Sequence, residues 1–314
     1  MPKCVSKGRS EVDQNSKHKM DEAALEAWAL EILAEYEWAT GHGPEVAPGS
    51  GERDTWNDIV LRGRLRNAVR NLNPSVPEEY LDQAIGEVIT PKSQSAIAEN
   101  RRIHQILVEG YRGIEYIDHE GNVQNPTINF LSSHPHMNDY LSLNQVTVAN
   151  LDGERRFDVV CYVNGMPLAF IELKKTGANT SVEGAHNQLQ TYVKEFGMAF
   201  RFANIVIPSD DLSAKYGTPF TPWNHFAPWN VDEDGSPVDP NNMVVAGEPV
   251  TQLDLLLDGL FNVERFGQLY SDFTAFDDTA EGLVMRIAKP HQYFAVTKAV
   301  GSTITAARGD KRAG

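Results

Sequence analysis

The stretch RRFDVVCYVNGMPLAFIELKK, residues 155–175, decides how this chain folds. Two apolar runs flank the stretch NGMP, residues 164–167, which predicts a β-hairpin. The second run, 168–173, is apolar on both faces of a strand, as expected for a strand buried inside a sheet. It ends in two charges, Glu172 and Lys174, which lie two residues apart and therefore point to the same face.

Charges that emerge from a buried strand are costly unless they are paired or bind a metal ion. With Asp158 on the first strand, the chain carries an acidic residue, a gap and then acidic-x-Lys. This set suits phosphodiester hydrolysis, because carboxylates hold Mg²⁺ and a lysine polarises the attacking water. The spacing predicts Asp158 and Glu172 as magnesium ligands and Lys174 as the catalytic lysine. A surface hairpin with solvated charges gives the same spacing by chance.

The geometry of the hairpin limits this interpretation. A two-residue turn followed by regular pairing would place the carboxylates of Asp158 and Glu172 on opposite faces of the sheet. A shared metal site therefore requires a three-residue loop with a bulge, or a kink near Asp158. The Gly at position 165 is compatible with a bulged turn.

The segment after the hairpin, about 182–197, has the apolar spacing of a helix. Gln188 and Tyr192 are four residues apart and so share one helical face. Together an amide and a phenol hydroxyl can hydrogen-bond a phosphate or an active-site carboxylate. The alternative is that Tyr192 belongs to the core and Gln188 merely flanks it.

Hydrophobic periodicity and turn residues organise the rest of the chain. Helices precede a run of strands, and one helix connects two later strands, which predicts an α/β fold with a mixed central sheet flanked by helices. Loops are expected at 40–53 and 208–249. Further helices are expected at 21–36, 59–72, 77–89, 93–109, 250–261 and 284–300, a strand–turn–strand unit at 114–131, and strands at 140–150 and 202–210.

Composition excludes several classes of protein. There is no apolar run long enough for a membrane helix or a signal peptide, and two cysteines make a disulfide framework improbable, so we expect a cytoplasmic protein. The net charge of −15 argues against tight DNA binding by this domain alone. Binding would then need metal, partner subunits or a local basic groove, for which Arg155, Arg156 and Lys175 are the candidates.

Several segments together resemble the N-terminal nuclease domain of type I restriction enzyme R (motor) subunits, in the RecB-like branch of the PD-(D/E)XK superfamily. These segments are 53–74, 138–145, 155–175, 187–192, 209–229 and 291–296. The resemblance implies a restriction-endonuclease-like fold with Asp158 and Glu172 as Mg²⁺ ligands and Lys174 as catalytic lysine. It also makes Gln188 and Tyr192 the family's QxxxY motif.

Two positions of the family's site are less certain to match in this chain: the N-terminal glutamate and the residue before Asp158. Such sites often include a glutamate from an N-terminal helix, and Glu22 and Glu26 are both candidates here. Phe157 stands before Asp158 where the superfamily usually has Pro. An apolar residue at that position should not abolish metal binding.

The resemblance further implies a bacterial or archaeal type I site-specific deoxyribonuclease. It would cut double-stranded DNA after ATP-driven translocation, in a complex with methyltransferase (M) and specificity (S) subunits. We expect a disordered tail at 1–20, a nuclease domain at 21–258, and a linker with the start of the motor at 259–314. No phosphate-binding loop is present, so no ATPase activity is expected from these residues. The alternatives are a non-catalytic module that docks the motor on the methyltransferase core, or another PD-(D/E)XK task such as single-strand exonuclease or junction resolution.

Overall fold

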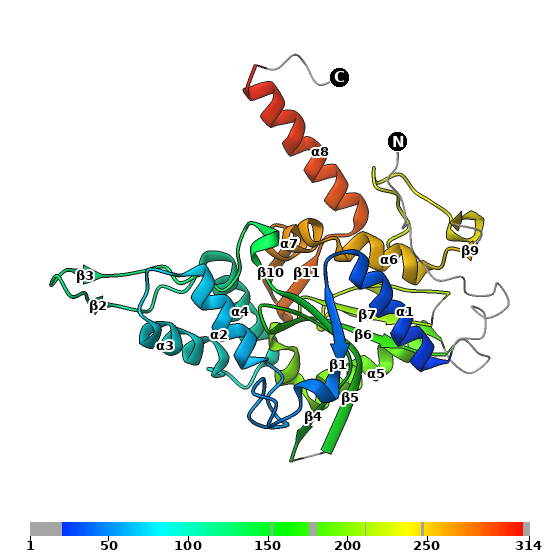
Figure 1. The fold of residues 1–314 in the computed structure, drawn as a ribbon. Coiled ribbons are helices and arrows are strands. Elements are labelled where there is room, and N and C mark those ends of the chain that lie inside the picture. The colour runs from blue at the N-terminus through cyan, green and yellow to red at the C-terminus, as the bar shows by residue number, and fades with distance from the viewer. Residues whose placement is uncertain (1–20, 152, 176–180, 211, 246–247, 310–314) are drawn as a thin grey trace.

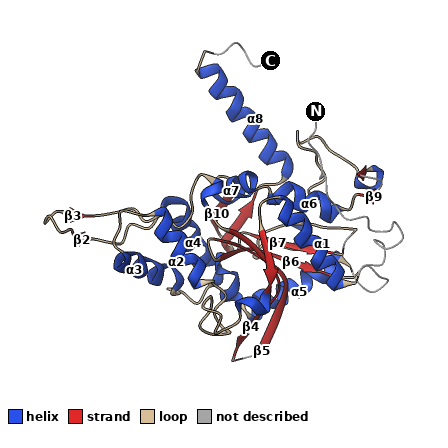
Figure 2. Cartoon of the chain, viewed as in Figure 1, coloured by secondary structure: helices blue, strands red, loops and turns tan. Residues whose placement is uncertain are grey.

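A computed structural model describes residues 21–151, 153–175, 181–210, 212–245 and 248–309. The predicted disordered tail, 1–20, lies outside these residues. At the centre is a five-stranded mixed sheet in the order β1-β4-β5-β6-β7, as Figures 1 and 2 show. β1 runs parallel to β4 and β6 runs parallel to β7, whereas β4, β5 and β6 are mutually antiparallel. The predicted fold class, a mixed central sheet flanked by helices, is confirmed.

The sheet strands are β1 (Ala39–His42), β4 (Tyr140–Asn150), β5 (Gly153–Val163), β6 (Met166–Leu173) and β7 (Ile205–Ser209). Three two-stranded ribbons are formed by β2 (Tyr116–Ile117) with β3 (Val123–Gln124), β8 (Val244–Val245) with β9 (Glu248–Pro249), and β10 (Thr274–Thr279) with β11 (Gly282–Ile287). The α-helices are α1 (Glu22–Glu35), α2 (Arg62–Leu72), α3 (Glu78–Ile89), α4 (Ala96–Glu109), α5 (Val182–Glu195), α6 (Gln252–Phe261), α7 (Val263–Ser271) and α8 (Pro290–Ala307).

Helices cover both faces of the sheet because its strands are apolar on both sides. In β7, Ile205 and Ile207 enter one hydrophobic cluster together with side chains of α1, α6 and α7. Val206 between them enters a second cluster that includes side chains of α5. Every residue of β6 is buried, which fits its central place in the sheet. The sheet is thus sandwiched between two helical layers.

The turn between β5 and β6 is a two-residue turn. Asn164 and Gly165 both have positive φ, 51° and 76°, as a type I′ hairpin requires. A Cβ at position 165 would lie 2.4 Å from the Leu61 carbonyl oxygen, so glycine is also needed for close packing against the start of α2. The predicted hairpin is confirmed, and the three-residue loop offered for it is wrong.

Some of the expected elements differ from the structure. The loop expected at 40–53 contains β1, whose four residues include three exposed ones and so lack a strand pattern. The helix expected at 59–72 begins at Arg62, and the 114–131 unit forms only the short β2–β3 ribbon. The helix expected at 284–300 begins instead at Pro290, because the residues before it pair with β10.

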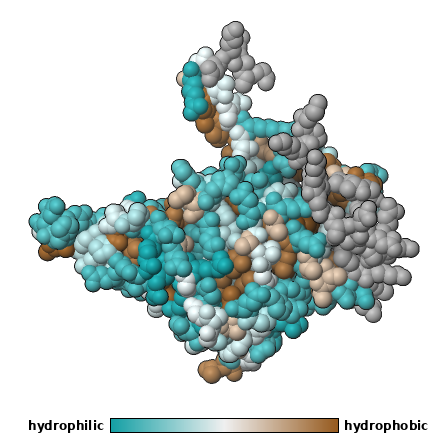
Figure 3. All heavy atoms as spheres, in the orientation of Figure 1, coloured by the Kyte–Doolittle hydropathy of each residue, from teal (hydrophilic) through white to brown (hydrophobic). Residues whose placement is uncertain are grey.

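The C-terminal helices α6, α7 and α8 contribute side chains to the same hydrophobic core as the central sheet. The boundary predicted at 258/259 lies inside α6, and Tyr293 and Phe294 of α8 belong to the same hydrophobic cluster as α1 and β6. The rest of α8 projects from the body of the molecule (Figure 1). Hydrophobic side chains, including Val296 and Val300, are exposed along it (Figure 3). In the described part of the chain, no helix is long and apolar enough to span a bilayer.

Candidate active site

Asp158 and Glu172 come together because β6 contains a bulge. Near the turn, Val163 pairs with Met166 and Tyr162 with Pro167, but Cys161 pairs with Ala169. Leu168 is therefore an extra residue, and the pairing beyond it shifts by one. Continuing from the pair Val159–Ile171, Asp158 stands opposite Glu172. The Leu173 amide donates to Asp158 Oδ2 at 2.8 Å, which ties the two strands together at this point.

A second irregularity lies beside Asp158, in β4 and β5. Phe157 and Val160 enter the same hydrophobic cluster although they are an odd number of residues apart. Opposite Asp158 in the β4–β5 register stands Gln145, whose φ of 54° departs from strand geometry. The sequence required a bulge in the turn or a kink near Asp158. The structure has a kink at Asp158 and a bulge in β6 rather than in the turn.

Lys174 lies at the end of β6, between Glu172 and α1. Its Nζ donates to Glu172 Oε1 at 2.9 Å and lies 4.0 Å from Glu22 Oε1 of α1. Glu172 is 1% exposed, and burial together with the charge on Asp158 raises its pKa to about 8, although Lys174 counteracts this rise. Burial also raises the pKa of Asp158. Burial alone would lower the pKa of Lys174, but the Glu172 and Asp158 carboxylates outweigh it and raise this pKa overall.

Glu26 of α1 is a further buried acid at this site. It is 4% exposed, and burial followed by the negative charge on Asp158 raises its pKa. Asn144 Nδ2 donates to Glu26 Oε2 at 3.1 Å, and the Gln145 side chain also hydrogen-bonds Glu26. The sequence prediction missed both amides. Two adjacent polar residues interrupting an otherwise apolar strand were the available signal.

Gln188 and Tyr192 lie where α5 covers this end of the sheet. The predicted shared face is confirmed, since Gln188 Nε2 donates to the Tyr192 hydroxyl. Tyr192 is 8% exposed and belongs to the core cluster, as the alternative interpretation held. Burial and the charges of Glu172 and Asp158 raise the pKa of its hydroxyl, so this hydroxyl lies near the acidic group. Tyr192 is thus both a core residue and a neighbour of the acidic cluster.

The donor set of this cluster fits a hard divalent cation. Asp158, Glu172 and Glu26 are carboxylates, each with a pKa raised first by burial, and Lys174 is the amine bonded to one of them. Oxygen ligands of this kind suit Mg²⁺, and a bound cation would relieve the cost of burying several negative charges together. Within the described residues, however, no three His, Cys, Asp or Glu side chains are already grouped at metal-binding spacing. Lys174 occupies part of the space around Glu172.

The three basic candidates for DNA contact are placed differently. Arg155 forms an ion pair with Glu195, with Nη2 2.6 Å from Oε2, at the end of α5. Arg156 is exposed. Its positive charge offsets part of the rise in the pKa values of Asp158 and Glu26, so it lies near the cluster. Lys175 follows Lys174 directly and is exposed.

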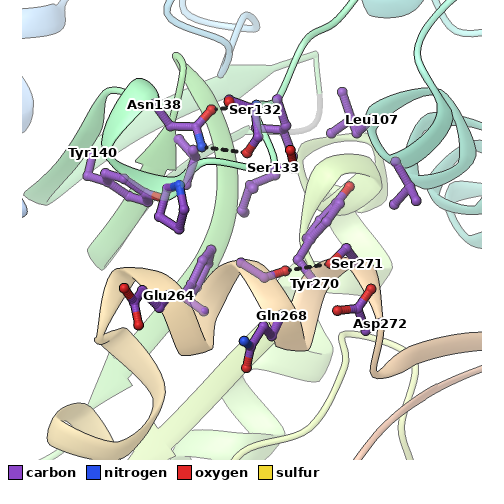
Figure 4. A pocket seen from close by; sticks show the side chains of 17 residues that line it. Leu107, Ser132, Ser133, Asn138, Tyr140, Glu264, Gln268, Tyr270, Ser271 and Asp272 are labelled. Atoms are coloured by element: carbon purple, nitrogen blue, oxygen red, sulfur yellow. Dashed lines mark hydrogen bonds between the residues drawn. The ribbon is translucent and has the colours of Figure 1, made fainter. Parts of the chain in front are cut away.

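A separate cavity of about 530 Å³ lies between α4, the loop at 131–138 and α7 (Figure 4). At its rim, Asn138 Nδ2 donates to the Ser132 carbonyl oxygen at 3.0 Å. Its charged lining consists of Glu264 and Asp272, and none of the predicted site residues borders it. The predicted site residues therefore lie on the sheet, α1 and α5, away from this cavity.

Comparison with known proteins identifies the family. The model of the type I restriction enzyme R protein N terminus matches residues 19–225, more than half of the chain. The chain belongs to this family. One relative, from Methanocaldococcus jannaschii, is named type I restriction enzyme MjaIXP endonuclease subunit and is 27% identical over 90% of this chain. Another, the type I restriction enzyme HindI endonuclease subunit of Haemophilus influenzae, is 28% identical over 94% of this chain. The chain spans 28% of the length of each of these two R-protein relatives.

Proposed function

We propose that this chain carries the endonuclease site of a type I restriction enzyme and hydrolyses phosphodiester bonds of double-stranded DNA with Mg²⁺. The observation that carries the proposal is the alignment of Asp158 opposite Glu172 with Lys174 bonded to Glu172. This arrangement depends on a bulge in a strand whose residues are all buried. Bulges that re-aim side chains are frequent beside active sites. A hairpin that only presented solvated charges would not bury Glu172 to 1% exposure.

In the proposed site, Asp158 and Glu172 are the metal ligands, and Glu26 is the additional acid in preference to Glu22. Glu26 is buried with Asn144 and Gln145 as partners, whereas the Glu22 side chain is 51% exposed. Bound Mg²⁺ would activate the water and neutralise the charge developing on phosphorus. The Lys174 ammonium would turn from Glu172 to the attacking water or the phosphate.

Gln188 and Tyr192 supply an amide and a hydroxyl next to the acidic cluster. We assign them to orienting the phosphate relative to Asp158 and Glu172. Arg156, which is exposed, and Lys175, which directly follows Lys174, are the proposed contacts to the DNA backbone. Arg155 is less suited than Arg156 because Glu195 already pairs with it. The net charge of −15 means that DNA would be held mainly through M and S subunits and a motor, as proposed for the complete enzyme.

The test is cleavage by the assembled restriction complex with Asp158→Ala, Glu172→Ala or Lys174→Ala in the R subunit. We expect each to abolish DNA cleavage while ATP-driven translocation continues, because the changes lie outside any motor. Arg66→Ala is a suitable control, since Arg66 is an exposed residue of α2 paired with Asp82. Normal cleavage by the Lys174→Ala complex would refute the proposal.

The competing function is a non-catalytic docking module, which the net charge of −15 favours. Calorimetric titration of the chain with Mg²⁺ separates the two. Binding that is lost in Asp158→Ala supports the nuclease. No binding to the unaltered chain supports the docking role.

A further inference from the structure

Two adjacent amide side chains of β4 reach the same buried carboxylate. Asn144 donates to Glu26 Oε2 at 3.1 Å, and Gln145 hydrogen-bonds the same group. Hydrogen bonds from these two amides and, after them, the positive charge of Arg156 favour the ionised form of Glu26 and offset part of the rise in its pKa. A carboxylate that is 4% exposed needs such donors if it is to remain ionised beside Asp158.

The backbone conformation of β4 explains how the adjacent residues Asn144 and Gln145 can both reach the Glu26 carboxylate. In a regular strand, the side chains of Asn144 and Gln145 would point to opposite faces. Gln145 instead has a φ of 54°, in the left-handed region. A non-glycine residue holds this conformation at a cost of about 1 kcal/mol or more, and it persists where the surroundings enforce it. The kink allows both amides to turn toward α1.

Contacts from the end of β1 hold this kink in place. A Cβ at Gly43 would lie 2.3 Å from the Gln145 carbonyl oxygen and 2.8 Å from the Val146 Cα, so only glycine permits this approach. His42 Nδ1 lies 2.6 Å from Asn144 Oδ1. Because an amide oxygen only accepts, His42 Nδ1 must carry the proton. This bond fixes the Asn144 amide with its NH₂ group toward Glu26.

We propose that Asn144 and Gln145 form an amide clamp, a pair of positioning residues that hold the Glu26 carboxylate toward Asp158 as the third acidic group of the metal site. This inference rests on the proposed function, because it assumes that Asp158 binds Mg²⁺. The clamp residues act through Glu26 and do not themselves contact the metal. Partners of this kind orient metal ligands, and their removal typically weakens metal affinity about 10- to 100-fold.

Two substitutions each remove one amide of the clamp. Gln145→Gly removes the amide but keeps the kink, since glycine adopts positive φ freely. Asn144→Leu keeps a side chain of similar size and removes the amide that donates to Glu26, without adding a charge. We expect calorimetry on the 314-residue chain to show Mg²⁺ binding about 10- to 100-fold weaker in each. Gln145→Asn should fall between, because asparagine tolerates left-handed φ and retains an amide.

A matched control is Asn122→Leu, which makes the same chemical change at an exposed residue between β2 and β3. It should leave Mg²⁺ binding unchanged. Melting temperatures in EDTA identify variants that are merely unfolded. Wild-type Mg²⁺ affinity in both Gln145→Gly and Asn144→Leu would overturn the clamp.

A double-mutant cycle distinguishes positioning from a general structural role. If the amides act through Glu26, then Gln145→Gly should cause no further loss of Mg²⁺ affinity in a Glu26→Gln background. Fully additive losses would overturn the inference. Asp158→Ala tests the underlying function separately. If Asp158→Ala abolishes binding while the amide variants bind normally, only the clamp fails; if Asp158→Ala binds normally, the metal site and the clamp both fail.

Discussion

Replacing Glu172 with Gln should stabilise the metal-free protein, and increasingly so as the pH rises. Burial raises the pKa of Glu172 from the usual 4.5 to about 8. The folded state therefore holds a proton that the unfolded chain releases, so the associated stability is full below about pH 4.5 and is lost as the pH rises toward 8. At about 1.36 kcal/mol per pH unit, the whole shift corresponds to nearly 5 kcal/mol. Glutamine resembles the protonated form and does not titrate.

The measurement is urea unfolding in EDTA at pH 5, 6.5 and 8, for the unaltered chain and Glu172→Gln. The difference in unfolding free energy between the two should grow in favour of the variant by about 3 kcal/mol between pH 5 and pH 8. The glutamine Oε1 can still accept a hydrogen bond from Lys174, and because glutamine does not titrate, this contact changes little with pH in that range. Glu31→Gln, at an exposed position of α1, is the control and should show no such trend.

Addition of Mg²⁺ sharpens the same experiment. A cation that binds the ionised carboxylates should stabilise the unaltered chain more at pH 8 than at pH 6.5, since fewer protons then compete. Glu172→Gln should gain much less from Mg²⁺. A stability difference between Glu172→Gln and the unaltered chain that stays constant from pH 5 to 8 would refute the assignment of Glu172 as a buried acid held uncharged in the metal-free fold.

Three further outcomes can be checked on the same chain. Gly165→Ala should lower the free energy of unfolding by about 2 kcal/mol or more, because a Cβ there meets a backbone oxygen at 2.4 Å and φ is positive; urea unfolding tests this. In a Cys4→Ser background, Cys161 should resist thiol reagents until the protein unfolds, since burial raises its pKa to about 12; rapid labelling of the native chain would contradict the fold around it. In the assembled complex, Arg156→Ala should weaken DNA binding more than Arg155→Ala, and equal losses in a filter-binding assay would contradict the placement of these side chains.

The hairpin and the residue types of the candidate site could be predicted from the sequence because their signals are local. The stretch 164–167 predicts a turn, and Glu172-Leu173-Lys174 at the end of an apolar run predicts charges beside a buried strand. The spacing of Gln188 and Tyr192 predicts their shared helical face in the same way. The short edge strand β1 was missed because its residues are mostly exposed, so only its parallel pairing with β4 makes it a strand.

The register of the site could not be read from the sequence. Whether Asp158 and Glu172 share a face depends on Leu168 forming a bulge, and no residue type at that position specifies one. The choice between Glu22 and Glu26 likewise depends on how α1 lies against β4, which is set by contacts between residues more than one hundred positions apart. The same long-range packing brings Gly43 onto the kink at Gln145.

The sequence by itself determined the hairpin of residues 155–175, the residue types of the acidic site and the mixed α/β class, because turn chemistry and apolar spacing act over a few residues. The tertiary structure alone decided that Asp158 stands opposite Glu172 and that Glu26 joins them with two amides around it. The physical reason is that register and side-chain convergence arise from packing between distant segments. A one-residue slip in β6 would leave every local signal intact and would still separate the carboxylates.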